Sequence, residues 1–142
     1  MSVLSVSKGC SDQTPYVQGQ AAPTGVAVDD ANVYWTNHAD GTLLRCAANG
    51  IGTCAGTPTT LATGLDSPTG VAVAVDGAGA GALVYFTEPP KGTVRACPLP
   101  DGCAAGTKDI ATGQSAPSGV AVDDALLYWA NEGDGRVMAL VR

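Results

Sequence analysis

One motif occurs three times in this chain and limits how the chain can fold. It begins at Pro23, Pro68 and Pro117 and reads Pro-Thr/Ser-Gly-Val-Ala-Val in each copy. The prolines lie 45 and 49 residues apart, and a repeat of this length made of short strands and turns is typical of a β-propeller. An aromatic segment follows each copy, and these segments are Val33–Asn37, Val84–Glu88 and Leu127–Asn131.

Each repeat predicts four antiparallel strands, which is the content of one propeller blade. The first strand is small and apolar, which suits the crowded region near the axis of the ring. The second strand is β-branched and aromatic, as packed strands usually are. The fold class predicted is therefore all-β, with four-stranded antiparallel blades and three blade-equivalents in the chain. In the first repeat the strands are expected at Gly25–Asp29, Val33–Asn37, Thr42–Cys46 and near Thr59–Thr63.

The chain is predicted to begin and end inside a blade. Segments that match a third strand occur near both ends, at Ser2–Ser7 and Gly135–Leu140, and Tyr16–Gln18 matches a fourth strand. One of the two third-strand copies is therefore surplus. The expected division is residues 1–22 as third and fourth strands of a split blade, 23–67 and 68–116 as whole blades, and 117–142 as first to third strands of a split blade.

Unpaired strand edges and bare blade faces favour association with another chain. We expect residues 117–142 of one chain and residues 1–22 of another to interleave into a shared blade. Two chains would then close a six-bladed ring, and the two-fold dimer is the commonest closed oligomer. Three chains would give nine blades, beyond the usual four to eight, so a homodimer is the expected partner arrangement and a homotrimer the alternative.

The second repeat contains an insertion rich in Gly and Ala between Val73 and Leu83. The first repeat Val precedes the repeat Tyr by 8 residues in the first and third copies and by 14 in the second. We place the insertion in the turn between the first and second strands, where it forms either a flexible loop or a binding loop.

Four cysteines occupy matching places in the first two repeats. Cys46 and Cys54 enclose one turn with glycine, and Cys97 and Cys103 enclose another. The spacings differ from the usual pattern of a zinc site. The sequence therefore predicts two disulfides, Cys46–Cys54 and Cys97–Cys103.

Disulfides persist in oxidising compartments, so an extracytoplasmic or secreted location is expected, with the signal peptide absent from this chain. Cys10 has no counterpart in its own segment and is expected to be unpaired, either as a free thiol or as a bridge between chains. The sequence has no run of 18 apolar residues, so membrane insertion is not expected. The net charge is −6, and the seven Lys and Arg residues are spread along the chain, so nucleic-acid binding is not expected either.

The repeat resembles the six-bladed propeller superfamily of the NHL and YWTD repeats. Pro-x-Gly-Val-Ala-Val-Asp followed by Val-Tyr is similar to NHL copies, and Tyr34–Asn37 is similar to the Tyr-Trp-Thr-Asp of the second group. Whole rings in these families carry about six repeats in one chain, so the resemblance implies half a propeller. Because Met1 and Ser2 fall inside a blade, the sequence favours an engineered or trimmed propeller fragment over a natural half-propeller.

The resemblance includes calcium-dependent lactonases, which place Glu, Asn and Asp on inner strands, because hard cations need oxygen ligands. Here the inner strands are Val26–Val28, Val71–Val73 and Val120–Val122, and none carries a metal-binding or proton-transferring side chain. Metals and cofactors are therefore not expected. The paired acids Asp29-Asp30 and Asp123-Asp124 are interpreted as turn residues rather than calcium ligands.

Three polar residues recur at the end of the second strand, namely Asn37, Glu88 and Asn131. They could contact a polar ligand around the ring, or they could cap turns. The sequence therefore predicts a non-catalytic binding or scaffold module that assembles as a homo-oligomer. A calcium-dependent hydrolase of the lactonase type is the alternative hypothesis. A third hypothesis is that the chain is a propeller fragment with no specific activity.

Overall fold

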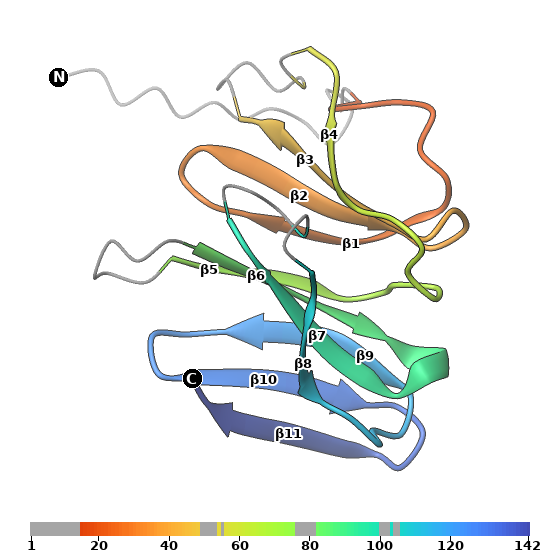
Figure 1. Ribbon diagram of the computed structural model, residues 1–142, viewed down its shortest axis with the longest axis vertical. Helices are drawn as coiled ribbons and strands as arrows, with labels where there is room; N and C mark the ends of the chain where they lie inside the picture. The colour runs from red at the N-terminus through yellow and green to blue at the C-terminus, as the bar shows by residue number, and fades with distance from the viewer. Residues whose placement is uncertain (1–14, 49–53, 55, 76–81, 100–102, 104–105) are drawn as a thin grey trace, which may run out of the picture.

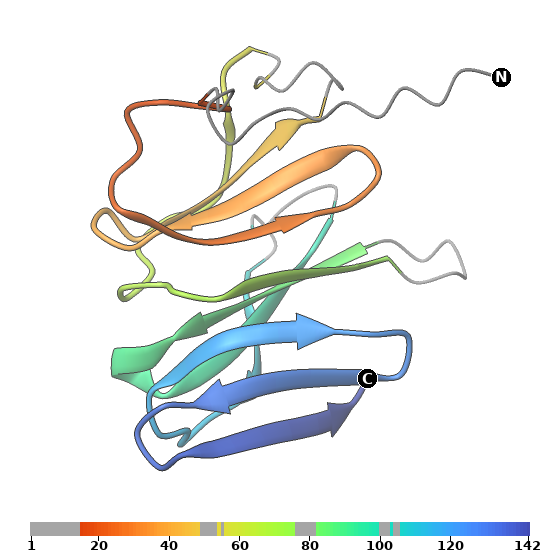
Figure 2. The ribbon, with the colours of Figure 1, turned by 180° about the vertical axis from the view of Figure 1, so that it is seen from behind.

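The computed structural model describes residues 15–48, 54, 56–75, 82–99, 103 and 106–142. These residues form three antiparallel sheets, which stack in the order of the chain (Figure 1). The all-β propeller architecture predicted from the repeats is confirmed. Figure 2 shows the same stack from behind, with each sheet running across the long axis of the molecule.

Each sheet pairs its strands in chain order. A short 3₁₀ helix, η1 (Pro89–Lys91), joins the second and third strands of the middle sheet. The first sheet contains β1 (Pro23–Val28), β2 (Asn32–Asn37), β3 (Thr42–Ala47) and β4 (Thr59–Ala62). The second contains β5 (Val71–Val75), β6 (Ala82–Glu88), β7 (Thr93–Pro98) and β8 (Lys108–Ala111). The third contains β9 (Pro117–Val122), β10 (Leu126–Asn131) and β11 (Arg136–Val141).

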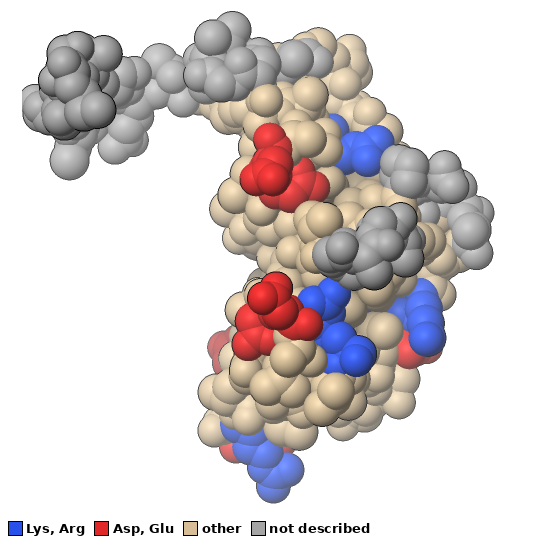
Figure 3. Space-filling model, turned by 90° about the vertical axis from the view of Figure 1, so that its left-hand side faces the viewer, with Lys and Arg blue, Asp and Glu red and all other residues tan. Residues whose placement is uncertain are grey.

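The first strands of the three sheets lie side by side. β1 contacts β5, and β5 contacts β9, as expected for the inner strands of neighbouring blades. The stack is bowed, with one convex side (Figure 3). Within the described residues, no helix has the length and apolar character needed to span a bilayer.

A tyrosine-linked turn ends the first strand of the first sheet. Asp29 Oδ1 accepts hydrogen bonds from the Ala31 and Asn32 N–H groups at 2.8 and 2.7 Å, and the Tyr34 hydroxyl donates to Asp29 Oδ2 at 2.7 Å. Burial raises the pKa of Asp29, but these hydrogen bonds outweigh burial and hold the pKa below its usual value. The interpretation of this acid pair as turn residues agrees with these contacts.

The same turn recurs in the third sheet at Asp123, which accepts from the Ala125 and Leu126 N–H groups and from the Tyr128 hydroxyl. In the second sheet β5 ends at Val75 and β6 begins at Ala82. The insertion predicted between the first and second strands therefore falls between them, and residues 76–81 lie outside the described part of the chain.

The hydrophobic core lies between sheets rather than within them. One cluster fills the space between the first and second sheets, and a second fills the space between the second and third. The first includes Tyr34, Leu43, Leu65, Val71, Val84 and Phe86. The second includes Ala74, Tyr85, Val94, Ala96, Leu127 and Trp129.

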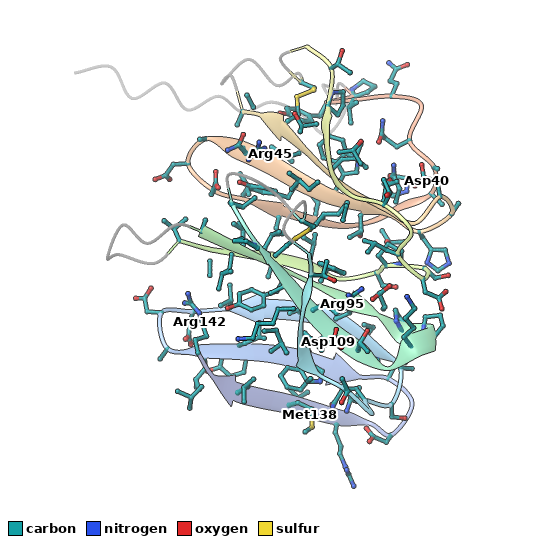
Figure 4. The ribbon with its side chains drawn as sticks, viewed as in Figure 1. Asp40, Arg45, Arg95, Asp109, Met138 and Arg142 are labelled. Atoms are coloured by element: carbon teal, nitrogen blue, oxygen red, sulfur yellow. A yellow bond between two sulfur atoms is a disulfide. The ribbon has the colours of Figure 1, made fainter. Side chains whose placement is uncertain are left out.

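Both disulfides predicted from the repeats are present, and their sulfur atoms are drawn in Figure 4. Cys46–Cys54 joins the end of β3 to the segment that leads to β4, and Cys97–Cys103 occupies the matching place in the second sheet. Cys10 lies outside the described residues.

The fourth strand predicted near Tyr16–Gln18 does not form in the single chain. Residues 15–22 contain no strand, because a strand needs a paired edge and the free edge of β11 lies at the far end of the stack (Figure 1). Tyr16 instead binds its own first sheet: its hydroxyl donates to the Ala47 carbonyl at 2.7 Å, and the Cys54 N–H donates to its carbonyl at 2.9 Å. Ser2–Ser7 lies outside the described residues.

Candidate functional site

We call the packed interface between two neighbouring sheets a joint. Each joint brings together two aromatic side chains from equivalent strands. Tyr34 of β2 and Phe86 of β6 share the first core cluster. Tyr85 of β6 and Trp129 of β10 share the second. A joint therefore uses the repeat tyrosine of one sheet and the following aromatic residue of the next.

The outward side of the first sheet is only partly covered. We call it the leading face and define it by Val26, Val28, Val33 and Trp35. Val26 is 71% exposed and Val28 is 65% exposed, whereas Val71, which is equivalent to Val26, is buried against the first sheet. A groove of about 450 Å³ lies on this face, lined by residues 16–20 and by Val26, Val33 and Trp35.

The outward side of the third sheet is open as well. We call it the trailing face and define it by Tyr128, Ala130, Val137 and Ala139, which share one side of the sheet because Tyr128 pairs with Ala139 and Ala130 with Val137. Val137 is 78% exposed, whereas the equivalent Leu43 and Val94 are fully buried, each at 0%. The trailing face thus carries, at Tyr128 and Val137, the same large side-chain types that the other two sheets bury at the equivalent positions.

Two of the predicted site residues, Asn37 and Asn131, lie inside matching amide clusters. Trp35 Nε1 and Asn37 Nδ2 both donate to Gln20 Oε1, at 2.8 and 3.1 Å. Trp129 Nε1 and Asn131 Nδ2 both donate to Gln114 Oε1, at 3.0 and 3.1 Å. Each glutamine sits in the segment that enters its sheet, so each cluster fastens that segment to the second strand.

Both asparagines are buried. Within the described residues, the Oδ1 atom of each is buried without a hydrogen-bond partner. The amide nitrogen of each asparagine therefore braces its segment, while the amide oxygen is buried beside it.

The third predicted site residue, Glu88, is fully buried at 0% exposure in an ionic cluster. Its Oε1 accepts from the Asp66 N–H at 2.6 Å and from Lys91 Nζ at 3.2 Å, and its Oε2 accepts from Arg95 Nη1 at 3.1 Å. Burial raises the pKa of Glu88, but the hydrogen bonds from Asp66, Lys91 and Arg95 outweigh burial and hold it below the usual range. Glu88 is therefore a carboxylate that fastens the entry segment of the second sheet.

Arg95 extends this ionic cluster to the outer strand. Its Nε donates to Asp109 Oδ1 at 2.9 Å, and it also binds the Thr107 hydroxyl. Figure 4 labels Arg95 and Asp109, which lie close together on the neighbouring strands β7 and β8. Both oxygens of Glu88 are engaged by groups of its own sheet and entry segment.

The three predicted site residues occupy the same end of their strands but are not brought together. Each is enclosed by contacts from its own sheet. A ligand contact at Asn37, Glu88 and Asn131 stays a prediction, and the hydrogen bonds favour the bracing of entry segments instead.

Sequence reasoning missed the glutamines of the amide clusters. Each glutamine precedes its tryptophan by 15 residues and its asparagine by 17. The signal lies in the middle repeat, where all three positions change together, to Leu65, Phe86 and Glu88. Phenylalanine has no N–H to donate, so no acceptor is needed at Leu65.

The inner strands enclose a groove of about 250 Å³ near the expected axis. Its lining consists of Thr24–Val26, Thr69–Val71 and Ser118–Val120, and none of these side chains titrates. Across the described part of the chain, no group of three or more His, Cys, Asp or Glu side chains could hold a metal ion. The groove offers hydroxyl, carbonyl and methyl groups to anything that enters it.

No protein-family model and no curated protein sequence matches this chain. Among solved structures, the chain is similar to one from the crystal structure of a nidogen/laminin complex, with 24% identity and a TM-score of 0.66. It is also similar to virginiamycin B lyase from Staphylococcus aureus, with 18% identity and a TM-score of 0.53. A third similarity is to the computationally designed Ika4 protein, with 15% identity and a TM-score of 0.50.

The extent of these matches differs. The chain is covered over 84% of its length by the first two matches but spans only 44% of the nidogen/laminin chain and 41% of the lyase. For Ika4 the match covers 87% of this chain and 93% of that one. At these identities the similarity establishes the fold, a partial β-propeller, and leaves the activity to be argued from the site.

Proposed function

We propose that this chain is a non-catalytic β-propeller scaffold that closes into a six-bladed ring by pairing with a second copy of itself. The observation that carries the proposal is the complementarity of the leading and trailing faces. Each filled joint combines a repeat tyrosine with the next sheet's aromatic residue. Tyr128 on the trailing face is equivalent to Tyr34 and Tyr85, and Trp35 on the leading face is equivalent to Phe86 and Trp129. Trp35 is already 4% exposed in the single chain, and Tyr128 would pack beside it in the ring.

A second copy is the occupant that fits both faces at once. The exposed valines Val26 and Val28 are equivalent to Val71 and Val73, which pack against the preceding sheet. Val137 is equivalent to Leu43 and Val94, which pack against the following sheet. Two copies in head-to-tail contact would bury all of these side chains, and rotation by a two-fold axis closes the ring.

The size of the matched propellers supports a ring of six blades. The chain spans a little under half of the nidogen/laminin chain and of the lyase, so two copies supply about one whole propeller of that size. A homotrimer would need nine blades, which exceeds the usual range of four to eight.

A binding role without catalysis is favoured by the lining of the axial groove. Its side chains are Thr, Ser, Gly and Val, and none of them supplies an acid, a base or a metal ligand. The two disulfides favour an exported protein, as does the fold shared with a chain of the nidogen/laminin complex. The uncharged hydroxyl lining suits a small polar, uncharged ligand.

Measurement of the solution mass tests the ring, and an acid placed on the trailing face supplies the matched variant. Light scattering should give twice the chain mass for the unsubstituted sequence. Val137→Asp should give the mass of one folded chain, because a carboxylate cannot be buried unpaired in a joint. Val75→Asp is the control, since Val75 is 63% exposed at the end of β5, away from both open faces. A single-chain mass for the unsubstituted sequence would overturn the ring.

Assay with lactones in the presence of calcium tests the absence of catalysis. We expect no lactone hydrolysis faster than the rate measured in buffer without the protein. Turnover that a chelator abolishes would replace this proposal with the hydrolase alternative.

A further inference from the structure

The joint between the first and second sheets contains a hydroxyl relay centred on Thr36. The Gly25 N–H donates to Thr36 Oγ1 at 3.0 Å, and the Thr36 hydroxyl donates to the Thr69 carbonyl oxygen at 2.9 Å. A Cβ atom at Gly25 would collide with this same carbonyl oxygen, so glycine permits the close approach of the two inner strands. One side chain thus links β1, β2 and the segment that leads into β5.

The joint between the second and third sheets repeats this relay around Thr87. The Gly70 N–H donates to Thr87 Oγ1 at 2.8 Å, and the Thr87 hydroxyl donates to the Ser118 carbonyl oxygen at 2.7 Å. A Cβ atom at Gly70 would collide with the Ser118 carbonyl oxygen. The relay is therefore a repeated part of how neighbouring sheets join.

A second repeated contact fastens the entry segment of each following sheet. The Leu65 N–H donates to the Gly41 carbonyl at 3.0 Å, and the Gln114 N–H donates to the Gly92 carbonyl at 2.9 Å. A Cβ atom at Gly41 or Gly92 would collide with the docked residue. Each joint therefore has one contact at the inner strands and one at the turn between the second and third strands.

The third sheet has both receiving positions, and both are open. Gly119 is equivalent to Gly25 and Gly70, but a Cβ atom there would meet no described atom within 4 Å. Its backbone is also outside the left-handed region that favours glycine. Nothing within the described residues requires a glycine at position 119. The inner strand of a following sheet, packed against this position, would require one. Gly135, which is equivalent to Gly41, is open in the same way.

One member of the relay is missing from the third sheet. Ala130 stands where the other sheets have Thr36 and Thr87, and alanine has no hydroxyl group. The Gly119 N–H therefore has no hydroxyl oxygen to bind, and the carbonyl of a following inner strand would receive no donor from this position.

We propose that a second copy docks in the register of the internal joints, and that Ala130 makes this joint weaker than the two within the chain. Thr24–Val26 of the second copy lies against Gly119, and the Gln20 N–H of the second copy binds the Gly135 carbonyl. The ring consequently opens and closes at the joints between copies while the joints within each chain stay closed. This inference rests on the proposed ring.

Restoring the hydroxyl tests the strength of the joint. Ala130→Thr should lower the dissociation constant of the dimer by up to about 100-fold, because one added hydrogen bond contributes up to about tenfold and the ring has two such joints. Ala130→Val is the matched control, since valine has the shape of threonine without the hydroxyl, and it should give no such gain. Sedimentation equilibrium over a range of concentrations measures all three constants.

A separate variant tests the register in which the second copy docks against Gly119. Gly119→Ala should leave the melting temperature of the dissociated chain unchanged, because its Cβ atom meets nothing there, and it should abolish the dimer. A dimer unaffected by Gly119→Ala would overturn the register.

The outcomes separate this inference from the proposed ring. A dimer of the unsubstituted chain that Ala130→Thr leaves unchanged, or that Ala130→Val tightens equally, overturns the weak joint and leaves the ring intact. If neither the unsubstituted chain nor Ala130→Thr associates, the ring itself fails and the inference fails with it. A dimer that appears only with Ala130→Thr would overturn the ring for the unsubstituted chain, while supporting the role of the missing hydroxyl in the joint.

Discussion

The second and third sheets contain the same repeat, yet one is enclosed and the other is half open. Val94 and Tyr85 of the second sheet are buried, whereas the equivalent Val137 is exposed and Tyr128 is half-buried. The strands themselves pair in the same way in both sheets. Burial in this molecule is therefore decided by the neighbouring sheet, because the apolar side chains of each sheet point toward its neighbours.

The largest expected effect comes from adding a Cβ atom at Gly70, where the third sheet packs closely, compared with Gly119, where the space is open. Gly70→Ala places a methyl group against the Ser118 carbonyl, and backbone cannot move aside cheaply. We expect a loss of about 3 kcal/mol or more in the free energy of unfolding, measured by denaturant titration. Gly119→Ala, measured on the dissociated chain, is the control and should be nearly neutral. Equal losses in both variants would mean that the two sheets do not differ at this position.

The next effect compares the ionic cluster around Glu88, which fastens the entry segment of the second sheet, with the amide cluster around Gln114, which fastens that of the third. We call them the ionic brace and the amide brace. Glu88→Gln removes a buried carboxylate from Arg95 and Lys91 and should cost about 2 kcal/mol, in the range of hydrogen bonds to charged groups. Asn131→Ala, which removes a neutral hydrogen bond to Gln114, should cost less. Chemical denaturation at neutral pH measures both.

Acid sharpens the same comparison. Because the pKa of Glu88 is lowered in the folded chain, its contribution to stability is complete above the ordinary value of 4.5 and is lost as the pH falls through the lowered one. The unsubstituted chain should therefore lose stability in this acid range more steeply than Glu88→Gln. Parallel acid dependence in the two proteins would contradict the ionic brace.

The tyrosine-linked turns give a smaller effect and compare a covered tyrosine with an open one. Tyr34→Phe removes a hydrogen bond to the Asp29 carboxylate from a buried site and should cost about 1.5 kcal/mol. Tyr128→Phe removes the corresponding bond to Asp123 from an open face and should change the melting temperature of the dissociated chain much less.

Absorbance titration checks the same pair. Burial and the Asp29 carboxylate raise the pKa of Tyr34 to about 12, so Tyr34→Phe should remove a late step of the titration. A Tyr128→Phe variant that loses as much stability as Tyr34→Phe would contradict the difference between the two sheets.

The sequence predicted most of the fold because the repeat signals are local. Pro-x-Gly-Val-Ala-Val marked the first strands, and the strand limits differ from the expected ones by only a residue or two, as at Pro23, where β1 begins earlier. The fourth strand expected near Tyr16 was assigned to a blade shared with a second chain, so it stays a prediction, because strand formation there depends on an edge that a single chain does not bring to it. The contacts of Asn37 with Gln20 and of Glu88 with Asp66 needed the structure, because these partners lie 17 and 22 residues away.

The smallest expected effect is a coupling energy between Gln114 and Trp129. It tests whether the pair Leu65 and Phe86 of the second sheet can replace this hydrogen-bonded pair of the third. Trp129→Phe leaves Gln114 Oε1 without its indole donor, and Gln114→Leu leaves the indole N–H without its acceptor. The double variant matches the middle sheet at two of its three positions, where Leu65 accompanies Phe86. The loss of stability in the double variant should therefore be smaller than the sum of the two single losses by about 0.5–1 kcal/mol. Chemical denaturation of all four proteins measures the coupling. Strict additivity would mean that the glutamine and the tryptophan change together for a reason other than their hydrogen bond.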